Sequence, residues 1–207
     1  MKKPELHTAL LLLRPVTMDD FKSVHAWASV PENVRWMTWG PNSEQDTRWW
    51  LAEAAAKPGY DFAVVLKSTG QVIGSCGIYA DEANDTGTLG WILHRDHHGC
   101  GYGTEFAQEL VRYGFEDLRL RRIIATCAAV NVGSSRIMER AGMRREGLRV
   151  KGVWARIDEE WVDRAEYGML AEEWNAKNQC VGVAIGRPGY SACSKSSDAQ
   201  CAPLHAR

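Results

Sequence analysis

The sequence predicts an α+β domain in which a mixed, mostly antiparallel central sheet carries helices on both faces. Two observations lead to this prediction. Apolar runs of strand length alternate along the chain with segments whose apolar residues recur at helical spacing. The expected order is a strand, two helices, a meander of three strands, a helix, a strand, a helix and two final strands, which favours one sheet covered on both sides.

The first third of the chain is expected to contain one strand and two helices. Residues 8–14 form the apolar run of the strand. Thr17 has the residue type of an N-cap, and acidic residues and then apolar residues at helical spacing follow it. Ser43 is expected to cap the second helix, with a short helix and loop over residues 31–41 between the two.

The rest of the domain is expected to supply most of the sheet. A helix is expected after a glycine-rich turn at residues 99–103, and another over residues 132–140 with Gly142 just beyond its end. Strands are expected at residues 62–66, 72–79, 88–93, 123–128, 143–150 and 161–170.

The end of the chain differs in composition. From Gln179 onward glycine, proline and serine recur without a sustained period, which is typical of disorder. We therefore expect one domain over residues 1–178 and a disordered tail over residues 179–207.

Composition and charge disfavour several classes of function. The formal net charge is −1, so no global field would attract nucleic acid or an anionic membrane. No segment approaches the roughly 20 apolar residues of a membrane span, and the apolar run at residues 9–13 is too short for a signal peptide. None of the six cysteines forms a CxxC pair, so no metal site is expected. We expect a cytoplasmic protein that binds neither membrane nor nucleic acid.

The glycine-rich turn lies between an expected strand and an expected helix. Three glycines at alternate positions allow a tight turn and a close approach to a ligand. The backbone amides there would point outward at a helix N-terminus, where a phosphate or pyrophosphate binds. These amides belong to Cys100, Gly101, Tyr102, Gly103 and Thr104.

This turn has two other interpretations. It could be a tight turn without a ligand. A dinucleotide fingerprint is disfavoured, because Thr104 stands at the third glycine position and residues 121–130 contain no carboxylate.

Several motifs in order resemble the GNAT acetyltransferase superfamily, and specifically the branch that acetylates ribosomal-protein N-termini (the RimJ/RimL type). His98, Gly101 and Gly103 resemble the family turn Q/R-x-x-G-x-G/A, with His98 departing from Gln or Arg. The resemblance covers about residues 8–175. Its other motifs are Leu12-Arg14-Pro15 with Asp20, residues 36–41, residues 131–143, Trp161-Val162-Asp163, Tyr167 and Glu173-Trp174.

The resemblance implies a GNAT-like acyl-CoA N-acyltransferase fold and an acetyl-CoA-dependent N-acetyltransferase without a metal. An amine would attack the acetyl thioester directly, and Asn131 would contact the pantetheine arm. A backbone amide near Trp91 or Ile92 would stabilise the negative carbonyl oxygen. Gly90 is interpreted as a β-bulge that splays this strand to admit the thioester arm.

Proton transfer has one candidate residue. Many family members protonate the leaving thiolate with a tyrosine, but Met138 stands at that position. Ser134 is the nearest replacement on the same helical face, and capping of the helix start is the alternative role. The branch's usual glutamate is replaced by Thr88, and no base is assigned among the remaining candidates, Asp81, Glu82, Asp163 and His94.

The acceptor is expected to enter between the first helical region and the last hairpin. Trp36 and Trp39 would line one side, with core packing as the alternative. Residues 154–161 would line the other, where Asp158 and its acidic neighbours would attract a cationic amine. The expected acceptor is a protein N-terminal α-amine; a small-molecule amine and a non-catalytic CoA-binding module are the alternatives. The chain is expected to be a monomer or a homodimer.

Overall fold

The computed structural model describes residues 4–56 and 61–184, with side chains placed up to residue 177. Eight strands form one sheet in the order β1-β2-β3-β4-β5-β6-β8-β7. Only β5 and β6 are parallel neighbours, and every other neighbouring pair is antiparallel. The predicted fold class is therefore confirmed. The strands are β1 (Leu6–His7), β2 (Leu11–Pro15), β3 (Asp61–Leu66), β4 (Val72–Asp81), β5 (Thr86–Leu93), β6 (Arg122–Ala128), β7 (Arg144–Ala155) and β8 (Glu160–Leu170).

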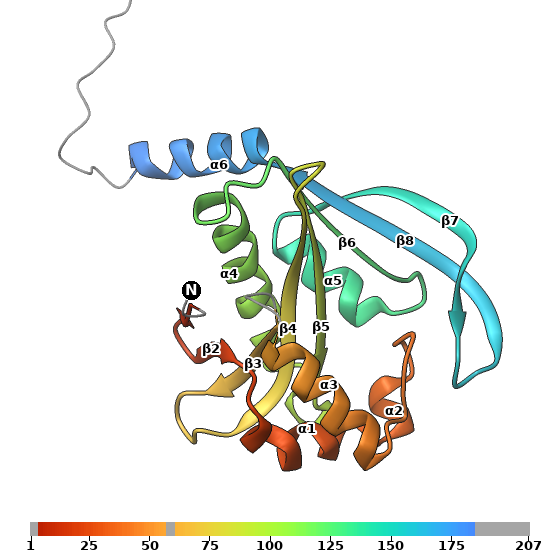
Figure 1. Ribbon diagram of the computed structural model, residues 1–207. Helices are drawn as coiled ribbons and strands as arrows, with labels where there is room; N and C mark the ends of the chain where they lie inside the picture. The colour runs from red at the N-terminus through yellow and green to blue at the C-terminus, as the bar shows by residue number, and fades with distance from the viewer. Residues whose placement is uncertain (1–3, 57–60, 185–207) are drawn as a thin grey trace, which may run out of the picture.

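Helices cover both faces of this sheet (Figure 1). One face carries α1 (Phe21–Ala28), which follows a short 3-10 turn (Met18–Asp20), α2 (Pro31–Val34) and α3 (Glu44–Ala56). The other carries α4 (Tyr102–Glu116), which follows a second 3-10 turn (Arg95–His97), and α5 (Val132–Arg140). The last helix, α6 (Ala171–Ala184), continues directly from β8.

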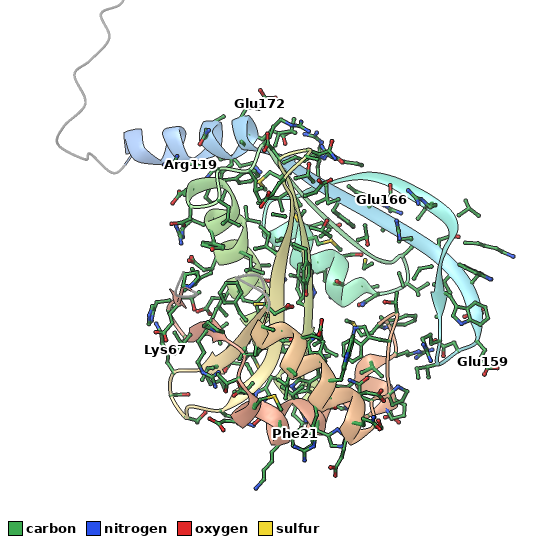
Figure 2. All side chains as sticks on the ribbon, in the orientation of Figure 1. Phe21, Lys67, Arg119, Glu159, Glu166 and Glu172 are labelled. Atoms are coloured by element: carbon green, nitrogen blue, oxygen red, sulfur yellow. The ribbon has the colours of Figure 1, made fainter. Side chains whose placement is uncertain are left out.

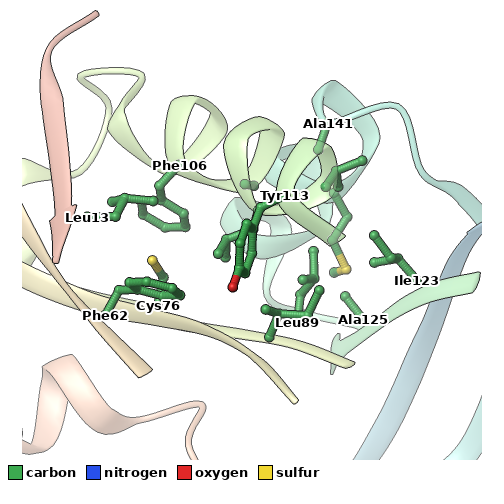
Figure 3. Packing of buried hydrophobic residues seen from close by; sticks show 14 of the residues in the cluster. Leu13, Phe62, Cys76, Leu89, Phe106, Tyr113, Ile123, Ala125 and Ala141 are labelled. Carbon is green, nitrogen blue, oxygen red and sulfur yellow. The ribbon is translucent and has the colours of Figure 1, made fainter. Parts of the chain in front are cut away.

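Two apolar clusters form the core, one on each face of the sheet. Alternation along a strand sends neighbouring side chains to opposite faces, so Val64 of β3 joins the α4 side and Val65 joins the α1–α3 side. Figure 3 shows the α4 side, where Phe62 and Cys76 from the sheet meet Phe106 and Tyr113 from the helix. β3 and β4 are buried on both faces, which explains their continuous apolar runs.

The expected N-caps are present at the first two helical regions. The Thr17 amide donates to the Asp20 carboxylate at 2.8 Å, and the Asp46 amide donates to the Ser43 hydroxyl at 3.2 Å. Asp20 also accepts both terminal nitrogens of Arg14 on β2, at 2.7 and 2.8 Å. This bidentate pair ties the start of the α1 region to the sheet. The residues expected to end α3 lie outside the described part of the chain.

The boundaries differ most from the sequence prediction in three places. The strand expected at residues 8–14 is β2 and begins only at Leu11, because residues 8–10 form a tight turn after the short β1, in which the Thr8 hydroxyl accepts the Leu11 amide at 2.9 Å. β7 runs on to Ala155, five residues beyond the expected end. α6 extends through Ala184, so residues 179–184 are helical rather than part of a disordered tail. The remainder of the expected tail, residues 185–207, lies outside the described residues.

The β7–β8 hairpin is a long arm at one end of the sheet (Figure 1). β7 forms the sheet edge, and its side chains are mostly exposed. The pairing shifts register twice along the arm, between Arg145 and Gly147 and between Arg149 and Val153. Bulges of this kind bend a strand. The arm thus curves around toward the side of the domain that carries α2.

Two features are absent from the described residues. None of the helices there has the length and apolar character needed to cross a bilayer. The same residues contain no cluster of three or more His, Cys, Asp or Glu side chains arranged to hold a metal ion.

Candidate active site

The sheet opens between its two parallel strands. β5 pairs with β6 only from Thr86 to Leu89, which face Arg122 to Ala125. Beyond that point β5 remains paired with β4 up to Leu93, while β6 remains paired with β8 up to Ala128. The two strands therefore separate over their last residues and leave a gap bordered by unpaired backbone.

The backbone of Trp91 faces this gap. The His94 amide donates to the Ile73 carbonyl at 2.8 Å, so alternate residues of β5, including Ile92, direct their backbone groups toward β4. Trp91 and Leu93 direct theirs to the opposite side. Of the two amides considered from the sequence, that of Trp91 borders the gap, and that of Ile92 belongs to the ladder with β4.

The expected bulge at Gly90 is absent. The pairing of β4 with β5 continues without a register shift from Gly74 to Asp81. The ring of Tyr79 lies over Gly90, where a Cβ atom would stand 3.4 Å from the ring edge. The glycine admits this ring, and the gap comes from the end of β5–β6 pairing instead.

The glycine turn leads from β5 into α4. Gly99 and Gly101 have φ values of +78° and +86°, and a Cβ atom at either position would meet nothing within 4 Å. Gly101 is the N-cap of α4, and no side chain of the described residues caps this helix end. The amides of Tyr102, Gly103 and Thr104 are thus the first N–H groups of an uncapped helix. They form a donor set in the field of the helix dipole.

Gly103 has a different role from the other two glycines. A Cβ atom at this position would stand 2.5 Å from the Ile137 side chain of α5. Because Gly103 has a hydrogen atom in place of a Cβ atom, α4 and α5 can pack closely beside the turn. Glu105, one turn into α4, accepts the Leu10 amide at 2.6 Å and anchors the helix start to the β1–β2 turn.

His98 folds back onto the strand it follows. Its Nε2 lies 2.9 Å from the Leu93 carbonyl oxygen. A carbonyl only accepts, so Nε2 carries the hydrogen atom in this contact. The Leu93 carbonyl faces the same side as the Trp91 amide, and His98 occupies it.

Asn131 and Ser134 lie together at the start of α5. The Asn131 side-chain oxygen accepts the Ser134 amide at 3.1 Å and caps this helix. Burial raises the pKa of the Cys127 thiol on β6, while hydrogen bonds with Ser135 and Ser134 oppose the rise. The two serine hydroxyls are therefore close to β6 where it leaves β5.

The segment from α2 to Trp39 connects the end of β5 with the β7–β8 hairpin. The Asn33 side-chain oxygen accepts the Arg95 amide at 2.9 Å, next to the end of β5. Two residues later, Arg35 Nε lies 2.9 Å from an Asp158 carboxylate oxygen at the hairpin tip. The Asp158 carboxylate is thus paired with the Arg35 guanidinium of the same chain.

The two tryptophans expected in the acceptor wall have different surroundings. Trp36 is partly exposed beside Arg35, whose guanidinium lies 4.8 Å from its ring centroid. Trp39 packs on the α1–α3 cluster, with its ring 6.4 Å from that of Trp27. Core packing accounts for Trp39, whereas Trp36 lies on the surface next to the hairpin.

A cavity of about 530 Å³ lies between this segment and the hairpin. Trp154 and Trp161 form a cross-strand pair on its wall, with ring centroids 5.5 Å apart. The other lining residues are Thr38, Gly152, Val153, Arg156, Glu159 and Arg164. Glu159 marks the hairpin tip in Figure 2.

A model of the acetyltransferase (GNAT) domain family matches residues 11–144. The chain belongs to the GNAT acetyltransferase family. The uncharacterized N-acetyltransferase YnaD of Bacillus subtilis is 32% identical over 168 residues, which cover 81% of this chain and 98% of YnaD. Such relatives make this GNAT chain an acetyltransferase enzyme, as predicted.

Solved structures agree with this assignment. A GNAT-family acetyltransferase from Bacillus anthracis superposes with a TM-score of 0.76 at 31% identity, covering 82% of this chain and all of that one. YdaF of Bacillus subtilis, described as a candidate ribosomal N-acetyltransferase, is 31% identical over 107 residues, 49% of this chain and 57% of YdaF. The GNAT fold is therefore shown, and the ribosomal-protein branch stays a proposal.

The four candidates for a general base in this GNAT domain either lie far from Trp91 or bind other groups of the protein. Asp81 pairs with Thr86 at the opposite end of β5, about 17 Å from Trp91 at 3.3 Å per residue; Glu82 follows it. Asp163 accepts the Lys151 amide at 2.9 Å, and the His94 ring accepts the Asp96 amide at 3.2 Å. Among these four, no carboxylate or imidazole is free beside the gap.

Sequence reasoning missed Arg164, which lines the cavity from β8. Its position in the sequence, amid alternating charges of a long strand, resembles an ordinary solvent-exposed face. The curvature of the hairpin brings it to the cavity, and no local sequence pattern predicts that.

Proposed function

We propose that this GNAT enzyme transfers the acetyl group of acetyl-CoA to a primary amine, and that the acceptor is the α-amine of a peptide or protein N-terminus. The observation that carries the proposal is the gap between β5 and β6. It places an unpaired backbone amide, that of Trp91, on the same side of β5 that leads into the uncapped end of α4.

The residues around the gap fit acetyl-CoA. Gly99 and Gly101 leave open space at a turn whose amides suit a diphosphate. The Asn131 side chain and the first turn of α5 lie beyond the last paired residues of β6, where a pantetheine arm would contact them. When bound, acetyl-CoA supplies an activated acetyl thioester.

The chain's own groups have distinct roles in this proposal. The Trp91 N–H binds the acetyl oxygen, on which negative charge develops. The Ser134 hydroxyl donates a proton to the departing sulfur. His98 supports the turn by holding the Leu93 carbonyl, and the cofactor contact of the family's Gln or Arg is taken over by the backbone amides.

The lack of an assigned base favours an α-amine over a lysine. An α-amine titrates near ~8 and a lysine side chain near ~10.4. At pH 7 the neutral, reactive fraction of an α-amine is therefore roughly 250-fold larger. An α-amine, which is more often neutral before it binds, needs less help with removal of its proton, and this favours an N-terminus as the acceptor.

We also propose that the catalytic unit is one domain that acts in the cytoplasm. The family match and both apolar clusters lie within residues 6–174. Cys76, Cys100 and Cys127 are free thiols, which suits a reducing compartment.

Thiol release from acetyl-CoA tests the proposal. Peptides with free N-termini and no lysine are compared with N-acetylated peptides that contain one lysine, and with small amines such as polyamines. Rapid release with the first group alone is expected, and mass spectrometry should place the acetyl group on the α-nitrogen. Transfer only to small amines would contradict the peptide acceptor. Release at the same rate with every amine would contradict both the peptide acceptor and the preference for an α-amine.

A further inference from the structure

We propose that the acceptor carries a carboxylate near its reactive amine, and that Arg164 and Arg156 in the hairpin cavity bind this carboxylate. The inference rests on the proposed function and names the class of acceptor. It reverses the sequence-based expectation that acidic residues at this hairpin attract a cationic amine.

Arg164 is incompletely satisfied by the protein. Its Nε is buried and has no hydrogen-bond partner in the described structure. Its Nη2 lies 3.5 Å from a Glu166 oxygen, and the same oxygen lies 2.9 Å from Arg149. A guanidinium presents five donors in a planar fork that matches a carboxylate. The side chain is 31% exposed, so its terminal nitrogens, rather than the buried Nε, are the groups that can bind an anion in the cavity.

The charges on the cavity wall add to a positive total. Among the lining residues, Arg156 and Arg164 carry two positive charges and Glu159 one negative charge. Glu166, which pairs with Arg164, is shared with Arg149 outside the lining and so does not neutralise Arg164 alone. The neighbouring Asp158 does not offset this positive total, because it pairs with Arg35 at 2.9 Å. The cavity therefore favours an acceptor that brings a negative charge.

The indole pair offers an apolar surface beside the charged groups. Trp154 and Trp161 form a pair with ring centroids 5.5 Å apart on the cavity wall, and the two residues are 39% and 57% exposed. The aliphatic part of the acceptor would lie against these rings.

The cavity is connected to the end of β5 through a single segment. Asn33 contacts the backbone after Leu93, Arg35 contacts the hairpin tip, and Thr38 lines the cavity itself. An acceptor bound in the cavity would extend along this segment toward the gap at Trp91. The reactive amine would then point toward Trp91, and the carboxylate would point toward Arg164 and Arg156.

Matched peptides test the inference. Ala-Glu and Ala-Gln hexapeptide amides, otherwise identical and free of lysine, differ only in the carboxylate. We expect kcat/KM to be about tenfold higher for the Ala-Glu peptide, as for a charge-assisted hydrogen bond. Ala-Ala with a free carboxyl terminus and its amide form a second pair, which tells a main-chain carboxylate from a side-chain one. Equal rates within both pairs would overturn the inference.

Variants locate the effect. Arg164→Gln and Arg156→Gln should abolish the preference for Glu over Gln, while Arg164→Lys should retain part of it. Arg119→Gln removes an exposed arginine far from the hairpin tip that Glu159 marks (Figure 2), and it should leave the preference intact. An equal loss for both peptides in the cavity variants, with unchanged melting temperatures, would contradict binding of the carboxylate.

A binding measurement separates this inference from the proposed function. Calorimetry with the N-acetylated Ala-Glu and Ala-Gln peptides, in the presence of CoA, does not depend on turnover. If no amine is acetylated, the proposed function fails, and a tighter Ala-Glu peptide would still support the cavity assignment. If amines are acetylated but both peptides bind equally, the inference alone fails.

Discussion

The glycine turn and the hairpin cavity offer different kinds of chemical groups to their proposed ligands. At the turn, the groups that face outward are backbone amides, exposed by Gly99 and Gly101 at the start of α4. In the cavity, the groups are side chains, chiefly indoles and guanidiniums on β7 and β8. The first site depends on backbone conformation and the second on the identity of a few residues.

This difference separates what the family shares from what each member can change. Almost any side chain can vary around a backbone amide without loss of the donor, provided the turn keeps its glycines. A single substitution at Arg164 or Trp161 alters the cavity directly. We therefore expect relatives to bind the same donor and to differ in their acceptors, and five changes test this division.

The largest effect is expected from Gly101→Asp. The new carboxylate would stand where the turn amides bind anions, and calorimetry should show CoA affinity reduced at least about 100-fold, or about 2.7 kcal/mol. Gly70→Asp is a matched control, because Gly70 also has a positive φ and open space, at the β3–β4 turn. Both variants carry the same backbone strain of about 1–2 kcal/mol, so a similar affinity in both would place the donor site elsewhere.

Asp20→Asn should destabilise the layer that borders the acceptor side. Asp20 is 5% exposed and holds Arg14, and removal of one partner from such a pair costs about 3 kcal/mol. Thermal unfolding should shift by roughly 10 °C, and the acceptor KM should rise more than the CoA Kd. A variant with an unchanged melting temperature would show that the pair contributes little.

The same carboxyl gives a pH dependence with a defined sign. Burial raises the pKa of Asp20, but the Arg14 guanidinium and the Thr17 amide outweigh it and hold the pKa below its ordinary value. Its contribution to stability is therefore complete above about pH 4, near the ordinary pKa, and is lost as the pH falls through the lower folded pKa. Unfolding curves should show a steeper acid loss for the parent than for Asp20→Asn.

Ser134→Ala should reduce turnover with little change in CoA affinity. The hydroxyl would act only as the sulfur departs, so kcat and kcat/KM should fall together, by about tenfold or more. Ser135→Ala is the control on the next residue, which contacts the Cys127 thiol at 3.5 Å. If Ser134→Ala retains full turnover, Ser134 is only part of the helix start that Asn131 caps.

A smaller effect is expected from Arg35→Gln. The variant frees Asp158 from its partner at the hairpin tip, which lowers the positive potential of the cavity. Exposed ion pairs have weak effects, so the acceptor KM should rise by about twofold to fivefold, more at low salt. The CoA affinity should remain that of the parent; a parallel loss of both affinities would contradict two separate sites.

The smallest effect is expected from removal of residues 185–207. A chain that ends at Ala184 keeps α6, including Trp174, whose ring lies 6.0 Å from that of Phe115. Melting temperature and turnover should both match the full chain, since the removed sequence lacks apolar periodicity. A lower melting temperature or a lower turnover would indicate that residues 185–207 contact the domain.

The sequence predicted the elements well where local patterns determine them. Residues 132–140 form α5 with the expected bounds, and Gly142 adopts a positive φ of +92° just after it. The glycine turn was also located, because the change from strand to helix period and the glycine spacing are both local. α6 was missed, since its residues beyond Trp174 lack an apolar stripe.

Features that depend on pairing between distant segments could not be predicted. The gap beside Trp91 exists because β5 and β6 pair over only four residues on each strand, and Gly90 suggested a bulge that is absent. The partner of Asp158 is Arg35, 123 positions away. Long-range contacts of this kind decide whether a charge is free for a ligand or already engaged.

The exposed edge of the sheet has a consequence for the solution behaviour of the protein. β7 offers unpaired backbone groups along twelve residues, and Val150 among them is 73% exposed. Two such edges brought together would align Arg145, Arg149 and Lys151 of one copy with cations of the other. Edge strands rich in lysine or arginine resist joining into longer sheets. We therefore expect the basic side chains on this arm to protect the folded protein from aggregation, and their neutralisation to make it precipitate at lower concentration.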